Sequence, residues 1–169
     1  PILEDKSVVN FWLKPQSNIS PYMNGKHDSF FEWIGCGVID ESKLFSTMDK
    51  QRGPIRKILY GQDNEKIYIS FLAKRNKLSS DNFIHIIIEP LNIKAKIALE
   101  SQKTSIGSLE IEVAYDDVFE LSIDKKSIDT DSISIIFEIE HDEKIIQSLP
   151  GFGELKIDLD DDYSQNWFI

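Results

Sequence analysis

The sequence places a tryptophan directly after a glutamate within FFEWIGCGVID, at Glu32 and Trp33. An indole ring presents a flat apolar face, and a neighbouring carboxylate accepts hydrogen bonds from hydroxyl groups. In a β-rich framework this pair predicts a contact with sugar rings, and Tyr60, Asp63 and Tyr22 are further candidates for the same contact. The alternative is that Trp33 packs in the core while backbone amides hold Glu32.

The residue types that commonly perform catalysis do not occur here in any recognisable catalytic pattern. The histidines His27, His85 and His141 are isolated from one another and from Cys36, so no local zinc-binding pattern is present. The nucleophile-elbow, P-loop and dinucleotide patterns are missing from the sequence. Because the chain has 29 acidic residues, a carboxylate pair for glycoside hydrolysis can be nominated almost anywhere and carries no weight. The sequence therefore predicts no catalytic residue, no metal ligand and no cofactor.

The acidic end of the chain resembles the start of a calcium-binding loop. Asp158, Asp160 and Asp162 have the spacing of the first ligands of an EF-hand. Tyr163 then stands where that loop needs glycine, and Ile169 stands where it needs a bidentate carboxylate. A solvated strand end or linker is the favoured interpretation, and a calcium site assembled from distant loops stays open.

The overall charge excludes two classes of partner. The formal net charge is −10, which repels nucleic acid and anionic membrane surfaces. Apolar runs such as 83–88 are too short to span a bilayer, and no basic segment leads into an apolar one at the start. The single cysteine, Cys36, cannot form an internal disulfide, which fits a reducing compartment. We therefore expect a cytoplasmic protein.

The length of 169 residues fits one domain with a core large enough to need no disulfide. We expect 1–169 to form a single domain. The chain begins at Pro1, within PILEDKS, and not at a methionine. This beginning indicates a fragment of a larger chain.

Short runs in which apolar and polar residues alternate dominate the sequence, as in half-buried antiparallel strands. In the clearest run, 109–115, the apolar positions alternate with Glu110 and Glu112. The predicted strands are Ser7–Leu13, Phe31–Ile39, Ile55–Tyr60, Ile67–Phe71, Phe83–Glu89, Ile93–Leu99, Leu109–Tyr115, Phe119–Ile123, Ile133–Ile139, Lys144–Leu149 and Leu155–Leu159. About ten strands at this spacing predict an all-β fold, a two-sheet antiparallel β-sandwich.

Helical patterns are almost absent. The sequence predicts at most one or two short helical turns, at Asp124–Thr130 and at Phe45–Lys50. Two polar stretches, Asn76–Asn82 and Ser101–Ser105, predict loops.

The stretch ISPYMNGKHDSFFEWIGCGVID, followed by FSTMD and ILYGQDNEKIYISFLAK, resembles the C-terminal accessory domain of glycoside hydrolase family 57 proteins. That family contains amylases, amylopullulanases and glucanotransferases. The matching positions are Ile19, Pro21, Asn24, Gly25, Phe31, Glu32, Trp33, Gly35, Gly37, Ser46, Met48, Leu59, Tyr60, Gly61 and Asp63. The segment Phe119–Ser127 and the tail LPGFGELKIDLDDD with Trp167 are similar too, so the resemblance covers nearly the whole chain.

This resemblance implies a β-sandwich related to the modules called DOMON-like or carbohydrate-binding-like. It also implies that the catalytic carboxylates lie in an upstream barrel outside this chain. Two positions depart from the family pattern: Asn24 stands where aspartate is more usual, and Cys36 stands where a small residue is expected. The first departure weakens the case for a binding role of the Asn24 turn.

The function that we expect is that of a non-catalytic accessory module of an α-glucan-active glycoside hydrolase. Such a module would dock on the parent enzyme's catalytic domain in the same chain and bind α-glucan weakly. The alternative is a purely structural docking domain, in which Phe30, Phe31 and Trp33 pack on the catalytic portion and touch no sugar. Trp12 and Trp167, near the termini, would cover the ends of the core or contact the rest of the enzyme.

Haem binding, as in some DOMON relatives, is a third alternative. It would need an axial pair such as Met23 or Met48 with His27 or His85.

Overall fold

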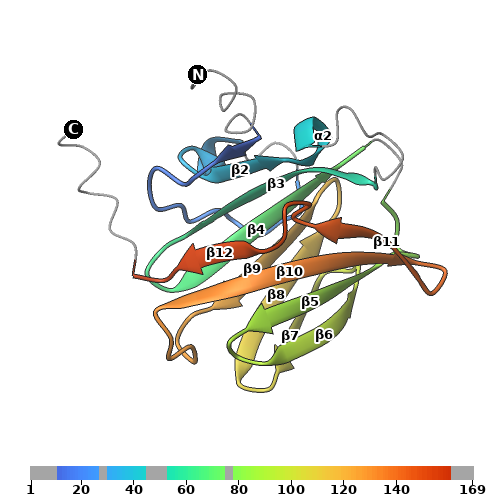
Figure 1. The fold of residues 1–169 in the computed structure, drawn as a ribbon. Helices are drawn as coiled ribbons and strands as arrows, with labels where there is room; N and C mark the ends of the chain where they lie inside the picture. Colours follow the sequence, from blue (N-terminus) through green and yellow to red (C-terminus); the bar gives the residue numbers. More distant parts are fainter. Residues whose placement is uncertain (1–10, 27–29, 45–52, 75–77, 161–169) are drawn as a thin grey trace, which may run out of the picture.

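Two antiparallel β-sheets face each other in the computed structural model, which describes residues 11–26, 30–44, 53–74 and 78–160 (Figure 1). The seven-stranded sheet contains, in spatial order, β1 (Trp12–Leu13), β2 (Gly37–Asp40), β3 (Ile55–Gln62), β4 (Lys66–Ala73), β9 (Phe119–Asp124), β8 (Leu109–Tyr115) and β7 (Gln102–Ile106). The five-stranded sheet contains β11 (Lys144–Leu149), β10 (Ser132–His141), β5 (Phe83–Glu89) and β6 (Ile93–Ala98), and β12 (Leu155–Asp158) also pairs with β10. The predicted two-sheet antiparallel sandwich is confirmed.

Alternation along each strand places the core between the sheets. In β10, Ile133, Ile135, Phe137 and Ile139 are at most 1% exposed, and the residues between them are only half-buried. Successive side chains of a strand point to opposite faces, so one face of each sheet is apolar and meets the other. The result is one continuous cluster of buried aliphatic and aromatic side chains to which ten of the twelve described strands contribute.

Three phenylalanines join the two sheets near the middle of this core. The ring of Phe71 in β4 meets the ring of Phe137 in β10 edge-on, with centroids 4.9 Å apart. The Phe119 ring in β9 lies 5.6 Å from the Phe71 ring. All three side chains are fully buried, and such contacts add stabilisation beyond the burial of apolar area.

Two of the predicted boundaries are wrong. Phe31–Ile39 is not one strand, because Phe30–Trp33 forms the 3-10 helix η1 and β2 begins only at Gly37. Gly35 between them has φ +91°, a left-handed conformation that ends the helical turn and redirects the chain. Ser101–Ser105 is not a loop, because most of it lies in β7. Its apolar content is too low to indicate a strand, and it is stabilised by pairing with β8.

The helical turn predicted at Asp124–Thr130 is a non-helical turn in which the amide of Lys126 donates to the carboxylate of Asp124. Polar residues favour such local bonds over a helix. The described residues instead have a short helix α2 (Glu41–Leu44) directly after β2. The second predicted turn, Phe45–Lys50, lies outside the described residues, as does the part of the first predicted strand before residue 11.

Polar side chains tie the edges of the two sheets together. The buried amide group of Gln147 in β11 accepts from the backbone N–H of Ile55 and donates to its carbonyl, both at 2.9 Å. Lys125 donates to the side chain of Gln62 and to the carbonyls of Asp63 and Leu159, at 2.7, 2.9 and 3.0 Å. Burial lowers the pKa of the Lys125 ammonium. These bonds replace the backbone ladder at places where the two sheets meet without sharing strands.

Glu41, at the start of α2, is 2% exposed and fastens β2 to the turn after β11. Both of its carboxylate oxygens accept from the backbone N–H of Gly151, at 3.0 and 3.1 Å. Burial raises the pKa of the Glu41 carboxyl to about 7, against the opposing effect of the Gly151 bond. The neighbouring Asp40 raises it further.

The aromatic contacts of the core predict the cost of removing one ring. Phe71→Ala should lower the free energy of unfolding by about 3–5 kcal/mol, because it leaves a cavity between the sheets. Phe31→Ala is the matched control, since Phe31 is 81% exposed, and should change stability by about 0.5 kcal/mol or less. Urea unfolding of both variants measures the difference, and equal costs would contradict this description of the core.

The burial of Glu41 predicts a pH dependence. Between pH 4.5 and about 7 the folded state keeps the Glu41 proton that the unfolded chain releases, so ionisation costs stability as pH rises. Glu41→Gln removes this ionisation. We therefore expect the free energy of unfolding of the wild type to fall relative to that of the variant across that pH range. Urea unfolding at several pH values tests it, with the exposed Glu154→Gln as control. A difference that stays constant with pH would show that Glu41 ionises freely.

Candidate functional site

The outer face of the seven-stranded sheet is divided into two halves of different character. Over one half lies a segment made of residues 15–26 and 30–36, here called the covering segment. Its buried side chains Ile19, Trp33 and Cys36 pack on Tyr68 of β4 and form a second apolar cluster. Burial raises the pKa of the Cys36 thiol to about 11, which keeps it a small apolar group in this cluster.

Trp33 is buried beneath the covering segment and is not open to a ligand. The side chain is 6% exposed, and η1 directs it toward the sheet face. A sugar ring needs an accessible indole face for stacking, and this one is occupied by Ile19 and Tyr68. The structure therefore corresponds to the alternative in which Trp33 is a packing residue.

A buried carboxylate holds the turn of the covering segment against the sheet. Glu120 in β9 is 1% exposed and accepts from the backbone N–H groups of Gly25, at 2.7 Å, and Asn24, at 3.2 Å. Burial raises the pKa of Glu120, while these two hydrogen bonds act in the opposite direction. The carbonyl of Gly25 accepts from the backbone N–H groups of Asp117 and Val118. The Asn24–Gly25 turn therefore anchors the covering segment.

Asp63, predicted as a sugar contact, is a second anchor. Its carboxylate accepts from Ser20 Oγ at 2.7 Å, from the hydroxyl of Tyr68 at 2.8 Å, and from the backbone N–H groups of Lys66 and Glu65. Burial alone would raise the pKa of Asp63, but these four bonds outweigh it and lower the pKa below its ordinary value. A carboxylate with four donors has little capacity left for a ligand.

The remaining predicted residues are divided between the core and the surface. Tyr60 is 3% exposed, and its hydroxyl accepts from the indole N–H of Trp12 at 2.8 Å. Glu32 accepts from the backbone N–H of Tyr22 at 2.5 Å, so its partner is a backbone amide, as in the alternative interpretation. The Tyr22 ring itself is 72% exposed. The structure thus brings Glu32 to Tyr22 and separates both from Tyr60.

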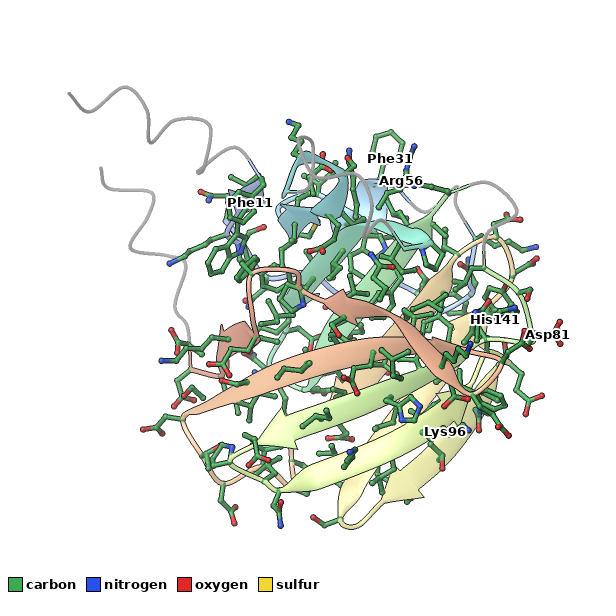
Figure 2. All side chains as sticks on the ribbon, turned by 45° about the vertical axis from the view of Figure 1, so that its right-hand side comes forward. Phe11, Phe31, Arg56, Asp81, Lys96 and His141 are labelled. Atoms are coloured by element: carbon green, nitrogen blue, oxygen red, sulfur yellow. The ribbon has the colours of Figure 1, made fainter. Side chains whose placement is uncertain are left out.

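Exposed apolar side chains gather on the outside of the covering segment. Phe31 and Ile34 are 81% and 58% exposed, and they are three residues apart across η1 and the turn that follows it, where such positions align. The bond between Glu32 and Tyr22 brings the exposed Tyr22 ring to the same region. We call Tyr22, Phe31 and Ile34 the apolar rim. Figure 2 shows Phe31 at the edge of the molecule, directed away from both sheets.

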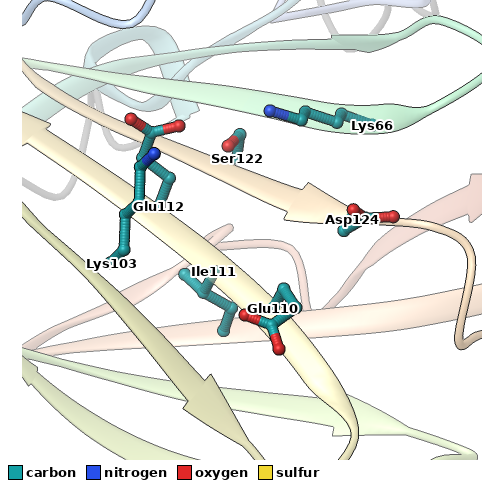
Figure 3. Close-up of a pocket in the computed structure, with 7 residues that line it drawn as sticks. All are labelled: Lys66, Lys103, Glu110, Ile111, Glu112, Ser122 and Asp124. Carbon is teal, nitrogen blue, oxygen red and sulfur yellow. The ribbon is translucent and has the colours of Figure 1, made fainter.

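The other half of the outer face is open and polar. It contains a shallow pocket of about 120 Å³, here called the polar trough, formed by strands β4, β9, β8 and β7 (Figure 3). Its lining residues are Lys66, Lys103, Glu110, Ile111, Glu112, Ser122 and Asp124. The outward direction of Glu110 and Glu112 was evident from the alternation in 109–115. Their grouping with the lysines depends on the register between four strands, which no local pattern contains.

Opposite charges in the polar trough face each other without closing into ion pairs. Lys66 is directly opposite Asp124, and Lys103 is directly opposite Glu112. Among the described residues, neither lysine forms a salt bridge within 4.0 Å. Ser122 lies between them at 2% exposure, and its hydroxyl has no hydrogen bond to any described residue. The trough therefore presents both donors and acceptors to solvent.

The histidines do not form a metal or haem site in the described part of the chain. His85 is hydrogen-bonded to Glu140 at 2.8 Å, and Lys96 lies 3.1 Å from the same carboxylate. The His85 bond lowers the pKa of Glu140, and Lys96 adds to this effect. His85 belongs to the five-stranded sheet, whereas Met23 packs on the outer face of the other sheet, so these two cannot share one iron.

Several sequence candidates lie outside the described residues: His27, Met48, Asp161, Asp162, Tyr163, Trp167 and Ile169. Within the described ranges, no group of three or more histidine, cysteine, aspartate or glutamate residues could hold a metal ion. In the same ranges, no helix has the length and apolar character needed to cross a membrane.

Comparisons with protein-family models, with curated proteins and with solved structures found no match to this chain.

The anchoring of the covering segment predicts the effect of a methyl group at Gly25. Its φ is +70°, and an added Cβ would lie 2.7 Å from the backbone nitrogen of Asp116. Gly107→Ala is the matched control, because Gly107 has φ +61° with nothing within 4 Å. Gly25→Ala should cost about 1–3 kcal/mol more than the control. Thermal unfolding measures both, and equal costs would mean that the turn is not held against the sheet.

Proposed function

We propose that this chain is a non-catalytic accessory module that docks, through the apolar rim, on the catalytic portion of an α-glucan-active glycoside hydrolase to which it belongs. The observation that carries the docking half is the contrast between buried Trp33 and exposed Phe31. A sugar-binding platform needs the indole to be accessible, and it is 6% exposed, whereas Phe31 is 81% exposed. The glycoside hydrolase half is supported by the sequence resemblance alone.

The composition of the apolar rim supports a protein partner. Tyr22, Phe31 and Ile34 are large side chains exposed on one segment. Large apolar side chains that are exposed close together mark contact surfaces, and aromatic residues are enriched in the cores of protein interfaces. The rim is presented by a segment fixed through Glu120 and Asp63, so little ordering is needed when a partner binds.

The hydrogen-bond partners of Glu120 and Asp63 support a module that does not catalyse bond cleavage. Glu120 and Asp63 have shifted pKa values, but their hydrogen bonds go to the covering segment and the strand turns. The hydrogen bonds of Asp63 explain its lowered pKa, and burial beneath the covering segment explains the raised pKa of Glu120. We expect the isolated chain to release no reducing sugar from starch, and measurable release would contradict the proposal.

The docking proposal predicts a loss of association on changing the rim. The catalytic portion of the longer chain is produced separately, and its binding to this domain is measured by calorimetry. Phe31→Ser should raise the dissociation constant by about tenfold or more, because a central aromatic anchor is lost.

Ile146→Ser is the control for Phe31→Ser, since Ile146 is 41% exposed on β11, in the other sheet. It should leave the affinity unchanged. Equal effects of the two variants, or no association of the wild-type domain, would show that the apolar rim is not a docking surface.

A further inference from the structure

In the polar trough the two lysines lie on the outer strands β4 and β7, and the three carboxylates lie between them on β8 and β9. One cross-strand row consists of Lys103, Glu112 and Ser122, and in this row the ammonium group is on the β7 side. In the next row, Lys66 is paired with Asp124, and the ammonium group is on the β4 side. Figure 3 shows the two lysines entering from opposite sides, with Ser122 between them. A ligand across these strands therefore meets an ammonium donor at each side and carboxylate acceptors between them.

The two lysines and Ser122 remain available for a ligand, whereas Glu110 already accepts from Ser105 Oγ and Asp124 from the backbone N–H of Lys126. Lys66 and Lys103 are more than 4.0 Å from every carboxylate oxygen of the described residues, although each has a carboxylate directly across the strand. Ser122 is 2% exposed and its hydroxyl has no described partner. No buried side-chain oxygen or nitrogen of the described residues lacks a partner, so the Ser122 hydroxyl is reached by solvent and can bond to water or to a ligand.

The lining selects the chemical class of the ligand. Two lysines face three carboxylates, so neither a strong anion nor a strong cation is matched in charge. The lining contains no aromatic ring, and the side chain of its one apolar residue, Ile111, belongs to the core cluster, so a planar aromatic ligand would find nothing to stack on. A hydroxyl group donates and accepts at one atom and can bridge an ammonium to a carboxylate.

We propose that the polar trough binds a neutral polyhydroxylated ligand, the class to which a sugar ring belongs. Adjacent hydroxyl groups would bridge Lys103 to Glu112 and Lys66 to Asp124, and one would bond Ser122. This inference goes beyond docking, because the apolar rim and the polar trough are on different halves of the outer face. The ligand therefore binds while the rim is occupied by a partner.

The trough is shallow and has no stacking surface, so the affinity is low. With a few hydrogen bonds exchanged against water, a dissociation constant on the order of millimolar is expected. Maltose is the probe, glycine betaine is the zwitterionic comparator, and inorganic phosphate is the anionic one. Titration of the ¹⁵N-labelled chain with each, followed by amide chemical shifts, locates the binding residues without an activity assay.

With maltose we expect saturable shifts at the amides of Glu112, Ser122 and Asp124. Glu112→Gln and Lys103→Met should each weaken binding by about tenfold, since each removes a charge-assisted hydrogen bond. Glu138→Gln and Lys94→Met make the same changes on the outer face of the five-stranded sheet and should have no effect. The amide spectrum of each variant shows directly whether the fold is intact.

Four results would overturn the proposal. The first is the absence of chemical-shift changes in the trough at about 50 mM maltose, a concentration well above the expected dissociation constant. The second is changes confined to the apolar rim, and the third is equal changes with glycine betaine or phosphate. The fourth is trough variants that bind maltose as tightly as the control variants do. None of these results bears on docking through Phe31, which is measured with a protein partner.

Discussion

Burial of alternate side chains between the two sheets is the constraint on which the rest of this structure depends. Each long strand directs its aliphatic residues inward, and the ring of Phe71 contacts the rings of Phe119 and Phe137 between the sheets. Because the period of a strand is two, fixing the inward residues also fixes which residues face outward. The outer face of the seven-stranded sheet, where both proposed surfaces lie, is a direct consequence.

The two halves of that outer face differ in whether their side chains are covered or exposed to solvent. On the side of β2, β3 and β4 it carries apolar groups such as Leu59 and Tyr68, which must be covered, and the covering segment does this with Trp33 and Ile19. On the side of β7 and β8 the outward residues are charged and remain in contact with solvent. The boundary between the halves lies at β9, where the buried Glu120 bonds the covering segment and Ser122 lines the open trough.

Hydrogen bonds of buried carboxylates give the covering segment a fixed position. Glu120 accepts from backbone N–H groups of the covering segment, and Asp63 accepts from Ser20 of that segment and from Tyr68 of the sheet. Leaving the buried Glu120 carboxylate without donors would be strongly unfavourable. The apolar rim is therefore a preformed surface, and its exposed rings are available without rearrangement of the core. The trough, by contrast, is formed by side chains on four paired strands, and its lysines and glutamates have long aliphatic stems.

The sequence by itself determined the fold class and most strands, because a half-buried strand has apolar residues at alternate positions and polar residues between them. Leu109–Tyr115 is recognisable for that reason, and 132–141 likewise. It could not determine β7, whose residues carry little apolar signal and depend on pairing with β8. Nor could it decide whether Trp33 was a platform or a packing residue, since an aromatic side chain suits both and only the position of the covering segment distinguishes them.

Tertiary structure alone decided the candidate site. The trough joins residues as far apart as Lys66 and Asp124, and the register of β4, β9, β8 and β7 is set by long-range packing and not by any local motif. Likewise the sequence predicts Asp63 as a sugar contact, but in the fold its carboxylate accepts from Ser20 and Tyr68 and anchors the covering segment. Local sequence specifies which face a side chain takes, and the three-dimensional fold specifies which neighbours it meets there.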